Sequence, residues 1–267
     1  MELKEGLEEI KLNMQYPKDF INQIITGDCL EVMKGIPDNS IDLVLTDPPY
    51  NIAADITVII DTRIHGNKNR KILSNLANSE WDKMNKMEYI EKMKIFFIQC
   101  KRVLKPSGIL CCFTADRYLS YFRDIINSLD MIYRQTCFWI KSNPPLQMRK
   151  VHFQNAVELF FFANKEKGHD SFRWENGQHH NTFYHPSVGG HEKTIHPTQK
   201  PIWLSKKLIE YFTNKNDLVL DPFLGSGTIA AACVELGRNF IGIEVNPEYV
   251  EIAKKRVAEA KRQEDLF

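Results

Sequence analysis

The segment LTDPPYN, residues 45–51, places an acid, two prolines and an aromatic ring directly after the apolar run IDLVL. Proline has no backbone N–H and fixes φ, so Pro48 and Pro49 stiffen the chain where a strand ends. The segment therefore presents the Asp47 carboxylate, backbone carbonyls and the Tyr50 ring on a rigid support. Acceptors that need not rearrange suit a reaction whose hydrogen bonds must be in place before the transition state. Taken alone, the motif also fits a stiff turn without chemistry.

A second cluster, DLVLDPFLGSGT (217–228), ends a strand in Asp221 and turns through Gly225 and Gly227 into an alanine-rich helix. Glycines at such a turn let a ligand approach the backbone closely. The third glycine of the dinucleotide fingerprint is missing, so NAD binding is only weakly indicated. The next strand ends in Glu244, whose carboxylate can accept hydrogen bonds from both hydroxyls of a ribose.

The acids Asp47 and Asp221 indicate the chemistry of the ligand at this turn. Their negative charge repels a pyrophosphate but suits the ammonium and sulfonium groups of S-adenosylmethionine. Strand-ending acids and glycine caps also occur in α/β sheets that bind nothing. The combination of these acids with Glu244 predicts a cationic ligand that carries a ribose.

Apolar runs of strand length alternate with amphipathic segments of helix length along the chain. This alternation predicts an α/β fold with a mostly parallel, seven-stranded sheet, helices on both faces and ligands beyond the carboxyl ends of the strands. Both acid clusters fall at such ends. The expected strands cover 23–26, 41–46, 108–114, 131–140, 156–163, 217–221 and 239–244, and the expected helices lie near 87–103, 117–129, 201–213, 228–236 and 247–263.

The length of 267 residues fits a single domain, 1–267, with one large buried core. The formal net charge of +1 argues against a uniformly basic chain, so a nucleic-acid surface must be a local patch. No apolar stretch approaches the roughly 20 residues of a membrane span, and we expect a soluble, cytoplasmic protein. The cysteines at 29, 100, 111, 112, 137 and 233 form no C-x-x-C pair, which predicts buried thiols rather than disulfides or zinc ligands.

Four motifs in one order closely resemble those of the amino-methyltransferases of DNA: ITGDCLEVM (25–33), LTDPPYN (45–51), HPTQKP (196–201) and DPFLGSGT (221–228). Their order resembles the β arrangement of that family, in which the catalytic motif precedes the target-recognition segment and the methionine-binding motif follows it. The resemblance covers nearly the whole chain. It implies a Rossmann-like methyltransferase fold with circularly permuted motif order, S-adenosylmethionine as cofactor and double-stranded DNA as partner.

The resemblance also implies which residues bind the cofactor. Those on its methionine half are Asp221, Phe223, Gly225, Gly227 and Thr228. Glu244 is assigned to the ribose, and Asp28 with Cys29 to the edge of the adenine. The motif that closes over the methionine end supplies His196, Thr198 and Lys200, of which the lysine can meet the methionine carboxylate.

The same resemblance makes Asp47, Pro48, Pro49 and Tyr50 the catalytic residues. An exocyclic amino group is a poor nucleophile because its lone pair is delocalised into the ring. If Asp47 accepts one N–H and the Pro48 carbonyl the other, the nitrogen is drawn toward a pyramidal state whose lone pair faces the methyl group. Tyr50 offers a face for an extruded base. Direct transfer needs neither a covalent intermediate nor a metal, and the histidines lack the spacing of zinc ligands.

Two stretches interrupt the alternation of strands and helices. We expect 51–80 to form a mobile DNA-contacting loop, although a charged loop that only meets solvent is also consistent with it. We expect 164–195 to be a short target-recognition insertion that reads about four to five base pairs. The predicted DNA-binding residues are Arg63, Lys68, Arg70, Lys71, Arg149, Lys150 and Arg173.

The preferred target is N6 of adenine. The DPPY motif occurs in both adenine and cytosine enzymes of this family, whereas serine in place of Asp47 would favour N4 of cytosine. An RNA or protein methyltransferase is the next alternative, because related motifs serve both, but the separate recognition stretch argues against it. A catalytically silent DNA-binding protein is disfavoured by the intact Asp47, Tyr50 and Glu244. A homodimer and a cognate restriction endonuclease are suggested by the resemblance alone.

Overall fold

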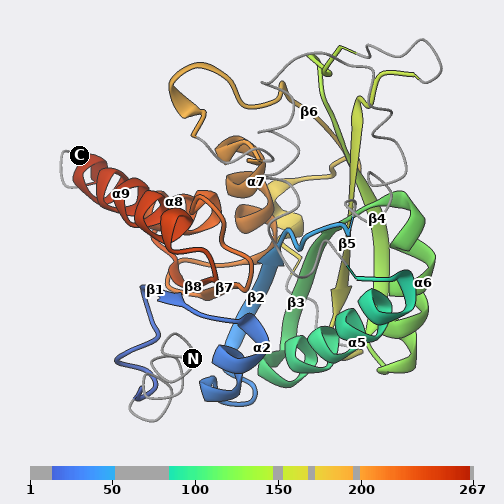
Figure 1. Cartoon of the computed structure of the whole chain (residues 1–267), viewed down its shortest axis with the longest axis horizontal. Coiled ribbons are helices and arrows are strands. Elements are labelled where there is room, and N and C mark those ends of the chain that lie inside the picture. The colour runs from blue at the N-terminus through green and yellow to red at the C-terminus, as the bar shows by residue number, and fades with distance from the viewer. Residues whose placement is uncertain (1–13, 52–83, 147–152, 168–171, 195–198, 265–267) are drawn as a thin grey trace.

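The computed structural model describes residues 14–51, 84–146, 153–167, 172–194 and 199–264. Within them, eight strands form one sheet in the order β1-β8-β7-β2-β3-β5-β4-β6 (Figure 1). The strands are β1 (Gln23–Thr26), β2 (Ile41–Thr46), β3 (Leu104–Thr114), β4 (Ile132–Ile140), β5 (Val157–Asn164), β6 (Thr182–Tyr184), β7 (Leu218–Asp221) and β8 (Asn239–Glu244). The helices are α2 (Cys29–Val32), α5 (Lys86–Val103), α6 (Asp116–Ser128), α7 (Ile202–Phe212), α8 (Thr228–Glu235) and α9 (Pro247–Glu264), with short 3-10 turns η1 (Met33–Gly35), η3 (Trp174–Asn176) and η4 (Gly190–Glu192).

Five neighbouring strands, β1, β8, β7, β2 and β3, run parallel to one another. Their carboxyl ends therefore meet at one edge of the sheet, which we call the carboxyl edge: Thr26, Glu244, Asp221, Thr46 and Thr114. Strand β5 runs antiparallel to β3 and begins at this edge, because Leu159 pairs with Thr114. Strand β4 ends there, since it is antiparallel to β5.

Two helical layers cover the sheet (Figure 1). Helices α2, α5 and α6 bury one face together with Val44 and Cys112 of the sheet, and α7, α8 and α9 bury the other together with Leu43 and Leu45. Neighbouring residues of β2 thus point to opposite faces, as the period of two in a strand requires. Because both faces are covered, the central strands are apolar along most of their length.

The predicted fold class is confirmed, with seven strands and five long helices near the positions expected from the sequence. The strand count was one too low: β6 contributes three residues at the edge of the sheet, paired in parallel with β4. A three-residue strand within a polar stretch is too short to show periodicity in the sequence. All six cysteines are buried and free, as predicted. None of the described helices combines the length and apolar character needed to cross a membrane.

Candidate active site

The DPPY segment follows β2 directly and lies at the carboxyl edge. The Tyr50 hydroxyl donates a 2.6 Å hydrogen bond to Oδ1 of Asp47. The hydroxyl of Tyr89, on α5, donates a 2.7 Å bond to the Pro49 carbonyl. None of the described residues donates to the Pro48 carbonyl. Since each carboxylate oxygen can accept a second bond, Asp47 and the Pro48 carbonyl form an acceptor pair with free capacity.

The backbone after Tyr50 is held from α6. One guanidinium nitrogen of Arg117 donates to the carbonyls of Tyr50 and Asn51, over 3.1 and 2.6 Å. Asn51 adopts the left-handed conformation with φ of 50°, which asparagine tolerates better than most residues. Its side-chain amide donates to the Met84 carbonyl over 2.9 Å. These contacts hold the DPPY segment at both ends, one through β2 and the other through α5 and α6.

Four charged side chains form a continuous chain at the carboxyl edge. The Lys200 ammonium forms an ion pair with Oδ2 of Asp47 and another, over 3.0 Å, with Oε2 of Glu158. Oε1 of Glu158 in turn lies 2.6 Å from the Lys141 ammonium. The Lys200 side chain is only 9% exposed, so water screens these charges little.

Burial and partners act in opposite directions on these groups. Burial raises the pKa of Asp47 and the Glu158 charge adds to this effect, while Lys200 and the Tyr50 hydroxyl oppose it; the net pKa lies above the ordinary range. Burial would also raise the pKa of Glu158, but Lys200 and Lys141 hold it below its ordinary value. Burial would lower the pKa of Lys200, yet the two carboxylates raise it. Lys200 is therefore charged.

Asp221, at the end of β7, is a buried acid without a cationic partner among the described residues. Its Oδ1 accepts bonds from the Thr46 hydroxyl, 3.0 Å, and from the Phe223 amide, 3.2 Å, and its Oδ2 has no hydrogen-bond partner in that part of the chain. Burial raises the pKa of Asp221 to about 8 despite these bonds, and the charges of Asp47 and Glu244 add to the shift. A cationic ligand would stabilise its charged form.

Glu244, at the end of β8, organises the neighbouring loops. Its carboxylate accepts 2.8 Å bonds from the amides of Gly225 and Asn246, and its backbone carbonyl accepts from the Gly27 amide at the end of β1. Asp28 and Cys29 follow directly: Asp28 caps α2 by accepting from the Leu30 amide, and the Cys29 thiol is buried. The residues predicted for ribose and adenine are thus brought together.

The glycine turn carries the other residues predicted for the methionine half. Gly225 and Gly227 have φ of 54° and 80°, a region that favours glycine. A Cβ on Gly227 would lie 2.7 Å from Cβ of Ala253, so the neighbour that requires a glycine here is helix α9. Thr228 accepts a 2.7 Å bond from the Arg256 guanidinium, also on α9. Phe223 packs against Phe96.

Most of the residues predicted to bind DNA lie outside the described residues; these are Arg63, Lys68, Arg70, Lys71, Arg149 and Lys150. Of the residues predicted to bind the cofactor, His196 and Thr198 also lie outside them. Arg173 is described and lies far from the acids. Its backbone amide donates to the Tyr211 carbonyl, and its side chain bonds to Asn214 and Glu175. These contacts lie at the C-terminal end of α7, whereas Lys200 precedes its N-terminus. The structure does not bring Arg173 together with the other predicted residues.

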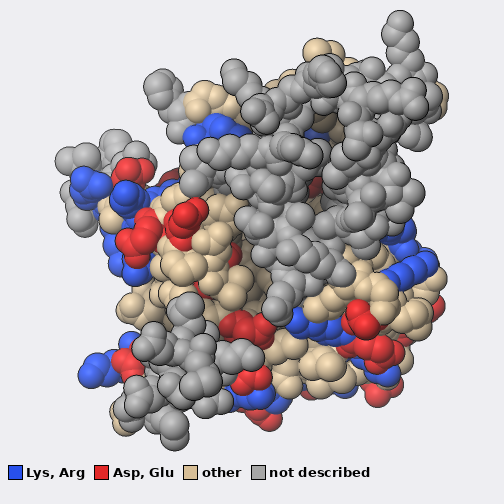
Figure 2. Space-filling model, viewed as in Figure 1, with Lys and Arg blue, Asp and Glu red and all other residues tan. Residues whose placement is uncertain are grey.

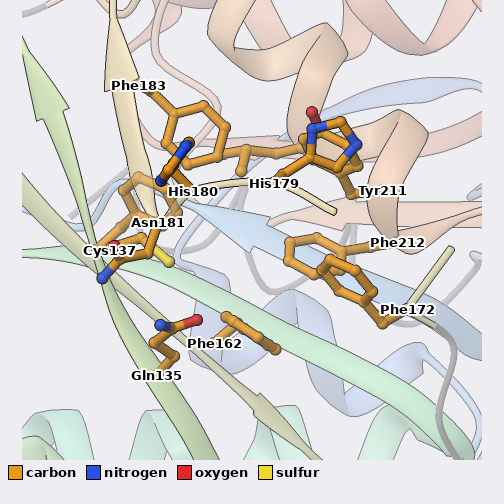
Figure 3. A pocket seen from close by; sticks show the side chains of 12 residues that line it. Gln135, Cys137, Phe162, Phe172, His179, His180, Asn181, Phe183, Tyr211 and Phe212 are labelled. Carbon is orange, nitrogen blue, oxygen red and sulfur yellow. The ribbon is translucent and has the colours of Figure 1, made fainter. Parts of the chain in front are cut away.

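Part of the expected recognition insertion packs against the sheet. Phe172, His179 and Phe183 line a small cavity with residues of β4, β5 and α7, among them Phe162 and Tyr211 (Figure 3). The cavity measures about 40 Å³, which holds a few water molecules and no cofactor. This part of 164–195 therefore packs against the sheet and α7.

Several functional candidates were missed in the sequence. They come from five different elements or their ends. Tyr89 and Arg117 contact the DPPY segment and the residue after it, and Thr46 bonds to Asp221. Glu158 and Lys141 belong to the chain of ion pairs that ends at Asp47. Glu158 carries a local signal, as a lone acid within the apolar run AVELFFFA.

The surface carries both signs of charge. Lys and Arg side chains are interspersed with Asp and Glu on the visible face (Figure 2), and the formal net charge of the chain is +1. Among the described residues, no group of His, Cys, Asp and Glu is arranged to hold a metal ion.

Comparison with known proteins identifies the family. The N6/N4 methyltransferase family model, described as DNA methylase, matches residues 41–255. The chain is 34% identical to the type II methyltransferase M.HinfI of Haemophilus influenzae, over 91% of this chain and 70% of the relative. It is 32% identical to the type II methyltransferase M2.MboI of Moraxella bovis, over 88% and 87%.

Solved structures agree with this result. The crystal structure of the M1.HpyAVI–SAM complex superimposes with a TM-score of 0.66 at 29% identity, over 88% of this chain and 98% of that one. The cytosine-N4-specific PvuII DNA methyltransferase, at 18% identity over 90% of this chain and 91% of that one, shares the fold with a TM-score of 0.69. The chain thus belongs to the N6/N4 family of DNA methyltransferases, whose cofactor is S-adenosylmethionine.

Proposed function

We propose that this protein methylates the exocyclic N6 amino group of adenine within a short recognition sequence of double-stranded DNA, after the base has been extruded from the helix. The observation that carries the proposal is the acceptor pair of Asp47 and the Pro48 carbonyl, placed next to the acids Asp221 and Glu244 at the carboxyl edge. No covalent intermediate and no metal is part of this proposal.

The acceptor pair acts on the target amine. Its two N–H groups donate to Asp47 and to the Pro48 carbonyl, which draws the nitrogen away from planarity and aims its lone pair at the methyl group. Tyr89 supports this arrangement because it occupies the Pro49 carbonyl and leaves that of Pro48 free. The ring of Tyr50 provides the surface on which the extruded base stacks. The hydrogen bond from Tyr50 to Asp47 couples the position of that ring to the acid.

The cofactor fits the donors and acceptors at this edge. When bound, S-adenosylmethionine supplies the methyl group on a sulfonium that is already a good leaving group. Asp221, whose Oδ2 lacks a partner among the described residues, would hold the cationic methionine half together with Phe223 and the turn through Gly225, Gly227 and Thr228. Glu244 would hold the ribose, and Asp28 and Cys29 the adenine edge.

The choice of adenine over cytosine rests on Asp47, because serine is the residue at this position that would favour cytosine. The likeness to the cytosine-N4-specific PvuII enzyme concerns the fold and does not bear on the base. Contacts to DNA from 51–80, from Arg149 and Lys150, and from parts of 164–195 belong to the same proposal, as do a homodimer and a partner endonuclease. Arg173 is the weakest member, since Asn214 and Glu175 already engage its side chain.

The test is incubation of the purified protein with labelled S-adenosylmethionine and unmodified DNA, followed by digestion to nucleosides and mass spectrometry. N6-methyladenine supports the proposal, and sequencing of the modified sites gives the recognition sequence. N4-methylcytosine would show that the target base is cytosine. Methylated RNA or protein in parallel reactions, without methylated DNA, would show that the substrate is not DNA.

Two variants separate the roles of the acids. Asp47→Ala is expected to lower the rate of transfer by about 100-fold or more while cofactor binding persists. Glu244→Ala is expected to weaken cofactor binding, measured by calorimetry. Full activity of the first variant, or an unchanged dissociation constant of the second, contradicts the assigned role.

A further inference from the structure

The chain of charges from Lys141 through Glu158 and Lys200 to Asp47, which follows β2, joins four parts of the fold. Lys141 follows β4, Glu158 is the second residue of β5, and Lys200 immediately precedes the residue that caps α7. All four side chains are at most 21% exposed. Two acids alternate with two bases, so the cluster is neutral when all four groups are charged.

We infer that Lys200 and Glu158 are positioning residues for methyl transfer: Lys200 keeps the Asp47 carboxylate charged and fixed in orientation, and Glu158 holds Lys200 in place and offsets its charge. This inference rests on the proposed role of Asp47 as acceptor for the target amine. It gives Lys200 a function at the amine rather than at the methionine carboxylate.

The surroundings of Lys200 support this assignment. Its ammonium lies between two carboxylates, and the rings of Tyr50 and Phe113 are 5.5 and 5.0 Å from it, within the range of cation–π attraction. The side chain is thus fixed by four contacts, and two of them, to Asp47 and Tyr50, are with the DPPY segment. A buried ammonium held in this way is a permanent counter-ion for Asp47.

Glu158 is needed because Lys200 alone would pair too strongly with Asp47. If the ammonium had only Asp47 as partner, it would compete with the target amine for Oδ2. A second carboxylate at 3.0 Å shares the ammonium, and Lys141 keeps that carboxylate charged. The target amine then meets an ionised acceptor whose counter-ion is already engaged elsewhere.

In the described part of the chain, the titratable groups that face Asp47 come from its own segment and from four other parts of the fold. They are Tyr50 in the same segment, Glu158 on β5, Lys200 before α7, Asp221 on β7 and Cys112 on β3. Burial raises the pKa of Tyr50 and Cys112, so both are neutral over the working pH range. Lys200 is the cation of this set, and its loss must therefore favour protonation of Asp47, whereas loss of the Glu158 charge must favour ionisation.

The experiment compares Lys200→Met and Glu158→Gln with the wild type. Carbon-13 NMR of protein labelled at aspartate carboxyl carbons follows the titration of Asp47 without any ligand, with the signal assigned from its absence in Asp47→Asn. The second readout is kcat against pH for methylation of DNA. In Lys200→Met, the midpoint of the Asp47 titration and the pH at which kcat falls on the acidic side are both expected to move up by at least about one pH unit. Glu158→Gln is expected to lower both.

Controls address folding and charge in general. Lys200→Arg keeps the positive charge, so its Asp47 titration should have the wild-type midpoint, unlike that of Lys200→Met. Lys207→Met and Glu210→Gln remove an exposed ion pair on α7 and should leave the midpoint unchanged. Midpoints that do not move in the Lys200 and Glu158 variants, or that move in the same direction, overturn the inference.

The two proposals fail in different ways. If the midpoints move in opposite directions but kcat keeps its pH dependence, the charge cluster is structural and the inference about transfer is wrong. If the wild type produces no methylated nucleoside, the proposed function fails, whatever the titration of Asp47 in the ligand-free protein.

Discussion

The hydroxyl of Thr46 donates a 3.0 Å hydrogen bond to Oδ1 of Asp221, joining the end of β2 to the end of β7. Thr46 directly precedes Asp47, and Asp221 begins the glycine turn, so this bond connects the proposed acceptor for the amine with the proposed site of the cofactor. Both residues are buried, which makes the bond stronger than it would be in water.

Thr46→Val removes this bond with little change of shape. The Asp221 carboxylate loses a donor that stabilises its charged form, so we expect affinity for S-adenosylmethionine to fall by about tenfold at neutral pH, the size of one hydrogen bond to a charged group. Calorimetric titration measures the dissociation constant. Thr46→Ser keeps the hydroxyl and is the matched control; equal affinity of Thr46→Val and the wild type would contradict the assignment.

Asp221→Asn is expected to stabilise the ligand-free protein. The pKa of Asp221 is raised in the folded state to about 8, so the folded protein binds a proton that the unfolded chain has released. Stability contributed by this acid is therefore lost as pH rises from about 4 to about 8. The melting temperature of the variant should exceed that of the wild type at pH 8, and the difference should vanish near pH 4. A difference independent of pH would contradict the buried charge as its cause.

Part of the site could be predicted because it depends on residues that directly follow apolar runs in the sequence. Asp47, Asp221 and Glu244 each follow an apolar run, and the carboxyl ends of parallel strands meet at one edge, so their proximity follows from the pattern. The same local patterns gave the positions of seven strands and five long helices.

The remainder depends on contacts between distant segments. Glu158 reaches Lys200 only because β5 runs antiparallel to β3 and starts at the carboxyl edge, and strand direction is not encoded in an apolar run. Arg173 is a residue that the sequence wrongly suggests for this edge. An arginine can bind DNA phosphates, but the packing of Phe172 against Tyr211 holds Arg173 at the C-terminal end of α7. From the sequence, Gly227 is expected to be a glycine because a ligand approaches its backbone. In the structure the close neighbour is Ala253 of α9.

Gly227→Ala should destabilise the protein by at least about 2 kcal/mol, because alanine is strained at φ of 80° and its Cβ would lie 2.7 Å from Cβ and 2.8 Å from Cα of Ala253. Chemical denaturation measures the free energy of unfolding. Gly189→Ala is the control, since Gly189 has φ of −147° and nothing lies within 4 Å of the added Cβ. Equal losses in the two variants would contradict the close approach of α9.

Phe153 is 98% exposed shortly before β5, and Leu146, in the segment after β4, is 86% exposed. β4 ends and β5 begins at the carboxyl edge. Exposed apolar side chains near the proposed site of an extruded base are suited to stack on the DNA. We expect Phe153→Ala to weaken DNA binding by about 1 to 3 kcal/mol, the size of one base–aromatic contact.

Fluorescence anisotropy with a labelled duplex measures this change, and the affinity for S-adenosylmethionine and the melting temperature should stay at their wild-type values. Trp174→Ala is the matched control: Trp174 is an aromatic residue 63% exposed, next to Arg173 at the end of α7 remote from the acids. Because both substitutions remove an exposed aromatic ring but only Phe153 belongs to the segment that leads into the carboxyl edge, a loss confined to Phe153→Ala locates the DNA there. Equal losses would mean that the duplex also crosses the opposite edge, where the side chain of Arg173 would have to exchange Asn214 and Glu175 for phosphate.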